Sequence, residues 1–408
     1  MKTPSLSPIF DSIDFVKKQR LPEKYKQKFS STDFKQARAF LLSYNGNEAT
    51  FNAYRREVER LLHWSWLIAK KSIHDLKRAD IEKYIQFCQK PPIKWIGTKK
   101  APRYIEKEGK RIPNPEWRPF VATVSKSEFR KGKSPNTKKY SLSQKAVREI
   151  FTILGSFYNF LIQEDHAEIN PVMHVKQKSR YFTKIQGKQK IRRLSELQWN
   201  YVIETAEIMA KETPKKHKKT LFIMTALYSM YLRISELVAS SRWIPKMCDF
   251  YRDQDGLWWF NVIGKGNKQR QIPVSDDMLK ALRDYRKSMD LPLLPSPTDK
   301  SPLIPKTLGA GPITSSNHLR KIVQVCFDQT IDRLREDKFR EDADALLEAT
   351  VHWLRHTGIS DDVKRRPREH VRDDAGHSSS AITDKYIDIE LRERHATAKK
   401  KPLKEILS

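Results

Sequence analysis

Most hydrophobic positions in the N-terminal half of the chain recur at the three- and four-residue spacing of amphipathic helices. This pattern predicts helices over Ser31–Tyr44, Thr50–Lys70, Arg78–Gln89 and Ser143–Glu164. In the second of these helices the apolar residues form one stripe, and the neighbouring Arg55 and Arg56 lie off it. We therefore expect a helical domain over residues 31–175, with the arginines of its second helix facing outward.

The C-terminal half combines helical periodicity with a short run of strand patterns. Ser195 and Gln198 have the spacing of a capping box, which marks the start of a helix. Apolar residues then alternate or cluster around two turn signals in Met247–Arg252, Leu257–Ile263 and Gln269–Val274. Helices are expected again over Ser275–Ser288 and Thr314–Arg335. The predicted fold class is mainly α with a small antiparallel β-sheet.

Three basic segments flank or interrupt these domains. Residues 1–30 read as a partly disordered tail, or as a small arm that touches DNA or a neighbouring subunit. The insert 93–140 is either a decorated surface loop or a basic flap on the DNA backbone, since so long a structureless loop is improbable in a compact domain. Residues 176–193 form a basic linker without an acidic residue, and 194–408 form a second domain with a polar helical tail.

The charge balance points to a polyanionic partner. The chain has 79 Lys and Arg against 49 Asp and Glu, which gives a net charge of +30. No apolar run approaches the ~18 residues that a membrane span needs, so nucleic acid is favoured over a membrane and over a merely solvated basic surface. The residues expected to contact DNA are Arg55, Arg56, Lys178, Arg180, Lys184, Lys188, Lys190, Arg192, Arg193, Arg320 and Lys321.

Cysteine and carboxylate spacing argue against disulfide and metal chemistry. The three cysteines are far apart, which fits a reducing cytoplasm and no metal knuckle. The acidic pairs at 361–362 and 373–374 are adjacent residues rather than a spaced ligand set, so a metal-dependent nuclease is disfavoured. We expect no metal or other cofactor, no secretory signal, and a cytoplasmic, nucleoid-associated protein.

One C-terminal stretch gathers the residues with reactive side chains. His352 and Arg355 form a His-x-x-Arg motif, Gly-His follows at His377, and Tyr386 comes nine residues later. An arginine fork donates two hydrogen bonds to a phosphate, and a tyrosine can act as a covalent nucleophile. A lone His-x-x-Arg is usually a solvated helix face. Two upstream blocks change that interpretation: LRISEL contains Arg233, and GKGNKQRQIPV places Lys265 at a predicted hairpin tip.

Together these blocks resemble the tyrosine recombinase, or phage integrase, family over roughly residues 195–388. LRISEL is similar to the first arginine box of the family, and GKGNKQRQIPV to its hairpin lysine. HWLRHT, with the later Gly-His and DKYI, is similar to its second box and its tyrosine. The resemblance implies a helical core-binding domain followed by a mixed α/β catalytic domain, which close as a C-shaped clamp on DNA.

On the matching positions, the resemblance implies a catalytic set of Arg233, Lys265, His352, Arg355, His377 and Tyr386, supported by Glu236. The two arginines would clamp the scissile phosphate, and the lysine would protonate the leaving 5′-oxygen. The first histidine would handle the tyrosine proton, and the second would hydrogen-bond the phosphate. The tyrosine would form a 3′-phosphotyrosyl link, which stores the phosphate so that rejoining needs neither ATP nor a metal.

Two departures from the family pattern concern local geometry. Tyr231 stands before LRISEL where the family commonly has a glycine, which predicts altered helix packing beside Arg233. Pro367 should break the charged helix that precedes His377.

Three functions fit these observations to different degrees. A site-specific recombinase or integrase of a mobile element or phage leads, because the LRISEL and GKGNKQR blocks are compact and the catalytic set is complete. A type IB topoisomerase uses a similar set, and a non-catalytic architectural DNA-binding protein would not need the tyrosine. The expected partner is double-stranded DNA with specific recombination sites, bound by a homotetramer of two dimers. Whether a partner recombinase, a DNA-bending protein or a directionality factor takes part stays open.

Overall fold

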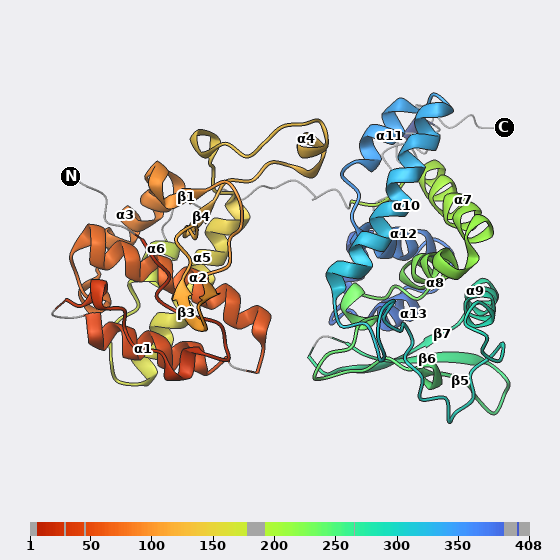
Figure 1. Cartoon of the computed structure of the whole chain (residues 1–408), viewed down its shortest axis with the longest axis horizontal. Coiled ribbons are helices and arrows are strands. Elements are labelled where there is room, and N and C mark those ends of the chain that lie inside the picture. The colour runs from red at the N-terminus through yellow and green to blue at the C-terminus, as the bar shows by residue number, and fades with distance from the viewer. Residues whose placement is uncertain are drawn as a thin grey trace, which may run out of the picture. The chain divides into compact units, whose positions relative to one another are not determined.

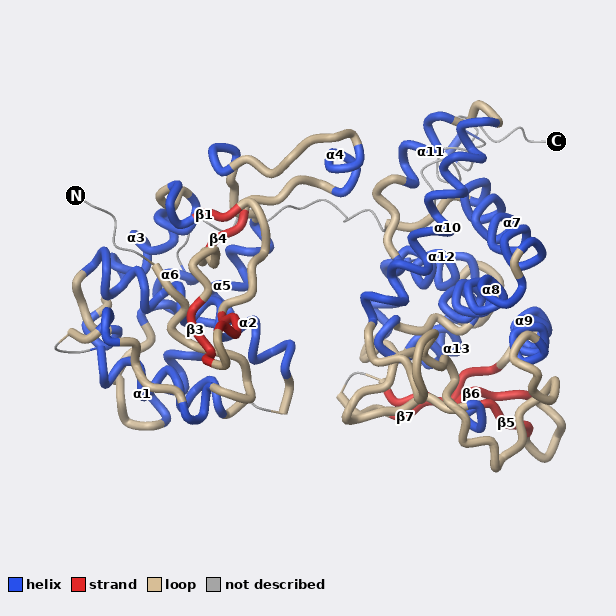
Figure 2. Tube along the Cα trace, in the orientation of Figure 1, coloured by secondary structure: helices blue, strands red, loops and turns tan. Residues whose placement is uncertain are grey.

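Helices make up most of both units into which the chain divides, Met1–Gly187 and Lys188–Ser408 (Figures 1 and 2). The computed structural model describes residues 6–27, 30–44, 46–177, 192–264, 266–386 and 398–399. Short strands complete each unit, so the mainly α fold class with a small antiparallel sheet is confirmed. Within these described ranges, no helix is long and apolar enough to cross a lipid bilayer.

The N-terminal unit is built on α1 (Ser30–Leu42), α2 (Glu48–Trp64), α3 (Arg78–Gln89), α5 (Gln144–Gln163) and α6 (Pro171–Gln177). Side-chain caps start two of them: Asn47 accepts a hydrogen bond from the backbone of Thr50 at 3.2 Å, and Ser143 from that of Ala146 at 3.2 Å. Their apolar stripes meet in one core that is rich in aromatic rings. The second helix is shorter than predicted, because one π-helical turn and a left-handed Lys70 end it.

The N-terminal segment is part of this core, which corrects its interpretation as a partly disordered tail. Ile9 and Phe10 are fully buried, and the carboxylate of Glu59 on α2 accepts hydrogen bonds from both of their backbone N–H groups. The ring of His63 contacts the carbonyl of Ser7 and the hydroxyl of Tyr25, each at 3.0 Å. The segment contains apolar residues such as Ile9 and Phe10, but their spacing does not specify which part of the chain they pack against, so the docking was not visible in the sequence.

The insert between α3 and α5 packs partly on the helical core and partly on the N-terminal segment. Strands β2 (Tyr104–Lys107) and β3 (Lys110–Pro113) form a hairpin, while β1 (Ile96–Gly97) pairs in parallel with β4 (Phe120–Val121). Trp95, Trp117 and Phe120 are buried, and Arg111 forms two hydrogen bonds to Asp11 at 2.5 and 2.8 Å. The remainder, which includes the short helix α4 (Lys126–Arg130), extends away from the helices of this unit (Figure 1).

The C-terminal unit surrounds a second core. Its main helices are α7 (Glu196–Glu212), α8 (Pro214–Ser229), α9 (Asp276–Lys287), α10 (Ser316–Glu336), α11 (Arg340–Leu346), α12 (Val351–Asp362) and α13 (Arg368–Ala375). Strands β5 (Phe250–Arg252), β6 (Trp258–Ile263) and β7 (Gln269–Pro273) form the predicted antiparallel sheet in the order β5-β6-β7. Ser195 and Gln198 form the predicted capping box at the start of α7.

The charged segment before His377 breaks where the sequence predicted. α12 ends at Asp362, and Pro367 is the N-cap of α13, where its missing N–H costs nothing. Gly376 ends α13 in the left-handed conformation, with φ of 61°. Two short turns, α14 (Ser380–Thr383) and η9 (Asp384–Tyr386), then bring the chain back to α12. The predicted polar tail beyond Tyr386 lies outside the described residues, apart from 398–399.

Candidate active site

Helix α12 supports the centre of the site. A methyl group added to Gly358 would lie 2.1 Å from the carbonyl oxygen of Tyr228, so only glycine allows α12 to pack this closely on α8. One turn earlier, Arg355 is buried, and its guanidinium donates to the carbonyls of Tyr231 and, at 2.5 Å, Ala375. The close helix contact therefore fixes Arg355 between the end of α8 and the end of α13.

A buried carboxylate orients the second arginine. Glu236, in the short 3₁₀ helix η7 (Ile234–Glu236), accepts hydrogen bonds from the backbone and the guanidinium of Arg233 at 2.8 and 3.0 Å. Arg270 on β7 donates two more to the same carboxylate, at 3.0 and 2.8 Å. Burial raises the pKa of Glu236, but the hydrogen bonds and charges of Arg270 and Arg233 outweigh it, so the net pKa is lowered. Glu236 therefore stays ionised and keeps Arg233 in place.

The Tyr386 ring packs against two imidazole rings. Its hydroxyl oxygen is 2.6 Å from Nδ1 of His356, and the two ring centroids are 5.4 Å apart. The ring of His377 is nearly parallel to it at 5.8 Å, and Thr383 contacts Nδ1 of His377 at 2.9 Å. Beneath the phenol, a small apolar cluster of Tyr231, Ile359, Val371 and Ala375 completes the support of the ring.

Positive charge is crowded around this phenol. Burial and the charge of Arg233 lower the pKa of Arg355 to about 9. Burial, with Arg355 and Arg233, lowers the pKa of His377 to about 4. Burial and the charges of Arg355, Arg320 and Arg233 also lower the pKa of His352. A cluster in which cationic groups disfavour one another is stabilised by an anion at its centre, so the site has the electrostatics of a phosphate-binding site.

Tyr231 takes a structural role that glycine could not. Its backbone is left-handed, with φ of 48°, and its side chain is fully buried. Its hydroxyl contacts the carboxylate of Asp362 and accepts a hydrogen bond from Arg366 at 3.0 Å. Arg366 in turn pairs with Asp374 of α13 at 2.6 Å. The altered packing predicted beside Arg233 is therefore a network that ties α13 to the end of α8.

Not all the sequence-predicted residues fall in the described part of the structure. Lys265, which the sequence predicts at a hairpin tip, lies outside it, as do Lys178, Arg180, Lys184, Lys188 and Lys190 of the predicted linker. Arg192 is exposed, whereas Arg193 lies 3.7 Å from Asp361. On α10, Arg320 and Lys321 are exposed, and the charge of Arg320 reaches His352.

Arg55 was predicted to contact DNA, but in the structure its side chain is buried. The docked N-terminal segment covers it, so Arg55 is buried and donates to the carbonyl of Asp11 and, at 2.6 Å, to the side chain of Asn52. Its neighbour Arg56 is half-exposed and pairs with Glu57 and Glu149 at 2.5 and 2.8 Å. The polar side of α2 is thus occupied by the protein's own N-terminal residues around Arg55.

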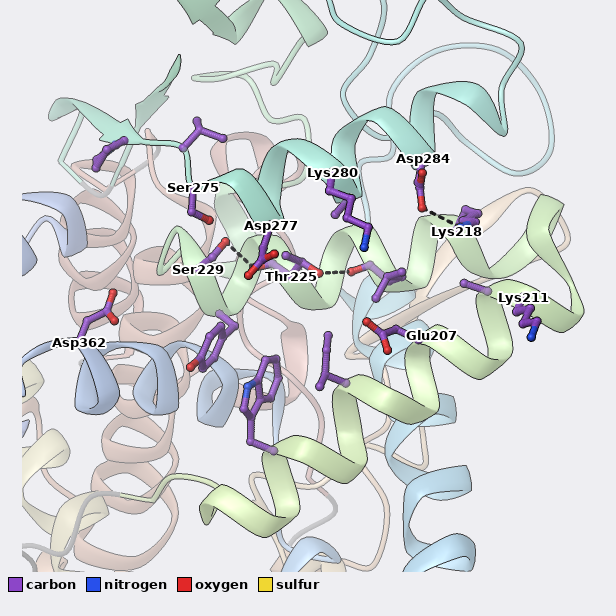
Figure 3. A pocket seen from close by; sticks show the side chains of 18 of the residues that line it. Glu207, Lys211, Lys218, Thr225, Ser229, Ser275, Asp277, Lys280, Asp284 and Asp362 are labelled. Carbon is purple, nitrogen blue, oxygen red and sulfur yellow. Dashed lines mark hydrogen bonds and ion pairs between the residues drawn. The ribbon is translucent and has the colours of Figure 1, made fainter. Parts of the chain in front are cut away.

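A groove of about 1270 Å³ lies elsewhere in the C-terminal unit, between α7, α8 and α9. Figure 3 shows Asp362 toward one end and the ion pair of Lys218 and Asp284, 2.9 Å apart, toward the other. Its lining mixes acidic and basic side chains and includes none of the cationic groups around Tyr386. The groove therefore lacks the clustered cationic groups that lie beside Tyr386.

Comparison with known proteins agrees with this geometry. No family model matches the chain. The chain is 26% identical to tyrosine recombinase XerD of Rickettsia prowazekii (strain Madrid E) over 154 residues, 37% of this chain and 45% of the relative. It is 29% identical to tyrosine recombinase XerC of Chlorobaculum parvum (strain DSM 263 / NCIMB 8327) over 141 residues, 32% of this chain and 38% of the relative. The chain thus spans about half the length, or less, of these curated relatives.

The fold is that of a solved recombinase. A crystal structure of the XerH site-specific recombinase, bound to palindromic difH substrate in a post-cleavage complex, aligns with a TM-score of 0.57. The alignment covers 98% of this chain and 100% of that one, at 13% identity. The chain is thus similar to tyrosine recombinases in sequence over about a third of its length, and to one of them in fold. Two residues of this site, His356 and Arg270, were not among those that the resemblance predicted.

Both residues left a signal in the sequence. His356 follows Arg355 directly and stands four residues after His352, so the two histidines lie on one face of α12. Arg270 is part of the block that identified Lys265. Their contacts, with residues thirty or more positions away, could not be read from that spacing.

Proposed function

We propose that the chain is a site-specific DNA recombinase or integrase that cuts and rejoins strands through a 3′-phosphotyrosine intermediate. The observation that carries this proposal is the convergence of Arg233, Arg355 and His377 on the buried phenol of Tyr386. A phosphodiester gathers negative charge on its non-bridging oxygens as it is attacked, and fixed cationic donors stabilise that charge without reorganising.

In the proposed reaction the oxygen of Tyr386 bonds to the phosphorus while the bond to the 5′-oxygen breaks. Arg233 and Arg355 hold the non-bridging oxygens, and His377 adds a hydrogen bond. Lys265 protonates the departing 5′-oxygen, a role consistent with its place in the hairpin between β6 and β7. One phosphodiester replaces another, so a second DNA hydroxyl can reverse the reaction without ATP.

Glu236 acts through Arg233 in this scheme. Its carboxylate is held by Arg270 and binds Arg233 through both the backbone and the guanidinium. The carboxylate of Glu236 forms ion pairs with two arginines, Arg233 and Arg270. These pairs balance its negative charge, which is why a buried acid is tolerated in a site that binds an anion.

Two other functions use parts of the same site. A type IB topoisomerase would relax supercoils with a similar catalytic set, and an architectural protein would bind DNA without cutting. The compact LRISEL and GKGNKQR blocks and the similarity to XerC and XerD favour the recombinase. A protein that only binds DNA would not need a buried tyrosine whose hydroxyl is hydrogen-bonded to a histidine.

The partners follow from that reaction. The substrate is double-stranded DNA with specific recombination sites, bound by four copies that act as two dimers. The long insert suits an enzyme of a mobile element or phage better than a housekeeping resolvase. Such an enzyme works on chromosomal or plasmid DNA, which places it in the cytoplasm with the nucleoid.

The first test traps the intermediate on a nicked suicide DNA duplex that carries the element's own end sequence, in the presence of EDTA. The wild type should become covalently attached to the strand with a 3′-phosphate link. Tyr386→Phe should bind the duplex with similar affinity and give no covalent product, because only the nucleophilic oxygen is lost.

A relaxation assay on supercoiled plasmid separates the two enzymatic functions. Relaxation of any supercoiled DNA by a monomer, without exchange between sites, would favour the topoisomerase. Covalent product from Tyr386→Phe would remove Tyr386 as the nucleophile, and tight binding without product from either protein would leave only the binding function.

A further inference from the structure

The hydroxyl of Tyr386 is paired with a histidine that the family resemblance did not assign. Nδ1 of His356 is 2.6 Å from that oxygen, within hydrogen-bond distance. His352 lies one turn earlier on α12 and is exposed, with its ring centroid 6.3 Å from that of His356. Among the contacts of the described residues, the hydrogen bond to the phenol is made by His356 and not by His352.

We propose that His356, rather than His352, is the general base that takes the proton of Tyr386. This proposal rests on the proposed recombinase function and adds a catalytic residue to it. As the tyrosine oxygen bonds to phosphorus and the 5′-oxygen leaves, the phenolic proton passes to Nδ1 of His356. In the rejoining step the same proton returns to the tyrosine oxygen when the DNA 5′-hydroxyl displaces it.

The surroundings of His356 suit a proton acceptor. Burial and the neighbouring His352 and Arg355 lower the pKa of His356 to about 4, so the ring is neutral near pH 7. In the tautomer that carries its proton on Nε2, Nδ1 accepts the hydrogen bond of the phenol. A base that was already protonated could not take that proton, so the cationic surroundings keep His356 ready.

A bound phosphate changes this balance in the direction the reaction needs. Among the described residues, the charged or titratable groups that act on the phenol, on His356 or on the two neighbouring histidines are His352 and Arg355 of α12, His377, Arg233, Arg270 and Arg320. Burial raises the pKa of Tyr386, while Arg355 and Arg233 partly offset that effect. A phosphodiester between these cations would neutralise part of their field and make an imidazolium at His356 less costly.

His352 then has a different position in the reaction. The residue is exposed, and its ring lies within the field of Arg355, Arg320 and Arg233. There it can donate a hydrogen bond to the DNA phosphate, but it lies a helical turn away from the residue that holds the phenol. The two histidines of the HWLRH sequence thus separate phosphate binding from proton transfer.

The test compares His356→Asn with wild type in single-turnover trapping on the suicide duplex. An asparagine amide oxygen can accept the hydrogen bond of the phenol, yet it cannot take the proton. We expect covalent product to form at least ~100-fold more slowly, the low end of what a general base contributes. His166→Asn, an exposed histidine of the N-terminal unit, is the matched control and should react like wild type.

A second substrate separates the base from the acid. With a 5′-bridging phosphorothiolate the leaving group needs no proton, so Lys265→Ala should recover its rate and His356→Asn should stay slow. His356→Ala should recover partly when imidazole is added, because the small base can enter the space left by the ring. Binding of the same duplex and the melting temperature of each variant identify protein that has not folded.

The outcomes distinguish this proposal from the proposed function. If wild type gives no Tyr386-dependent product, the function itself fails. If wild type reacts and His356→Asn matches it, or recovers fully on the phosphorothiolate, His356 is not the base and the recombinase proposal stands. If folded His356→Asn binds the duplex but stays slow on both substrates, and imidazole restores His356→Ala, the assignment holds.

Discussion

The histidines of this chain illustrate how burial sets charge at the scale of single residues. His63 is fully buried, and its ring is in contact with the Ser7 carbonyl and the Tyr25 hydroxyl. Burial, together with Lys24, lowers its pKa to about 3. The folded chain therefore keeps His63 neutral, while the unfolded chain protonates the same residue below its usual pKa of about 6.5. The free energy of docking the N-terminal segment on His63 therefore depends on pH.

We expect acid to destabilise the N-terminal unit through His63. Because the folded-state pKa is depressed, the stability is present above about pH 6.5 and is lost as the pH falls toward 3. Between pH 7 and pH 5 the loss from this residue should be roughly 2 kcal/mol. Chemical denaturation of the whole chain at both pH values measures it. His63→Gln should show a smaller difference between them, and an unchanged difference would rule out His63 as the source.

At the scale of elements, the active site depends on how tightly α12 packs on α8. Gly358 allows that contact, and Arg355 then reaches the carbonyls that end α8 and α13. A hydrogen-bond network also connects the end of α8 to α12 and α13; it consists of Tyr231, Asp362, Arg366 and Asp374. Since protein interiors are close-packed, a shift of one helix would displace a buried guanidinium from both carbonyls.

Gly358→Ala should therefore damage both stability and cleavage. Its methyl group would lie 2.1 Å from the Tyr228 carbonyl oxygen, a backbone atom that cannot move cheaply. We expect a loss of about 1–3 kcal/mol in the free energy of unfolding, typical of overpacking, and slower covalent trapping. Gly155→Ala in α5 is the control, because its methyl group would meet only the Met173 sulfur at an ordinary 3.7 Å. Equal stability of the two variants would show that α12 can move away from α8 without cost.

At the scale of the whole molecule, charge determines how the protein approaches DNA. The net charge of +30 favours binding to any duplex, and the release of counterions makes that binding sensitive to salt. The basic run at 176–193 joins the two units and contains no acidic residue. We propose that it follows the phosphate backbone while the units hold the duplex, which adds affinity without adding sequence specificity.

Replacing Lys184, Lys188 and Lys190 with glutamine should weaken DNA binding and reduce its salt dependence. Each lost phosphate contact lowers the slope of log K against log salt by about 0.9. A titration of duplex DNA at several salt concentrations measures that slope. The control replaces Lys280, Lys287 and Lys300, which changes the net charge equally. A slope that stays at the wild-type value in the linker variant would show that these lysines do not contact phosphate.

The local features of this protein could be predicted from the sequence alone. The helices of both units follow from apolar periodicity and from caps such as Asn47 and Ser195, which depend on neighbours a few residues away. The β-sheet followed from alternation around turn signals, and Pro367 marked the break before α13. The reactive residue types could also be identified from the sequence, because the functional group of an arginine, a histidine or a tyrosine is the same wherever it lies in the fold.

Contacts between distant residues were decided only by the tertiary structure. Arg55, which the pattern of α2 places on its polar side, is covered by residues 6–27, and the hydroxyl of Tyr386 contacts His356 rather than His352. Arg270 and Glu236 share an ion pair across 34 positions of sequence. Periodicity specifies which face of an element is apolar, but which element covers that face depends on packing of the whole unit. The sequence therefore determined the elements and the reactive groups, and packing determined which groups act together.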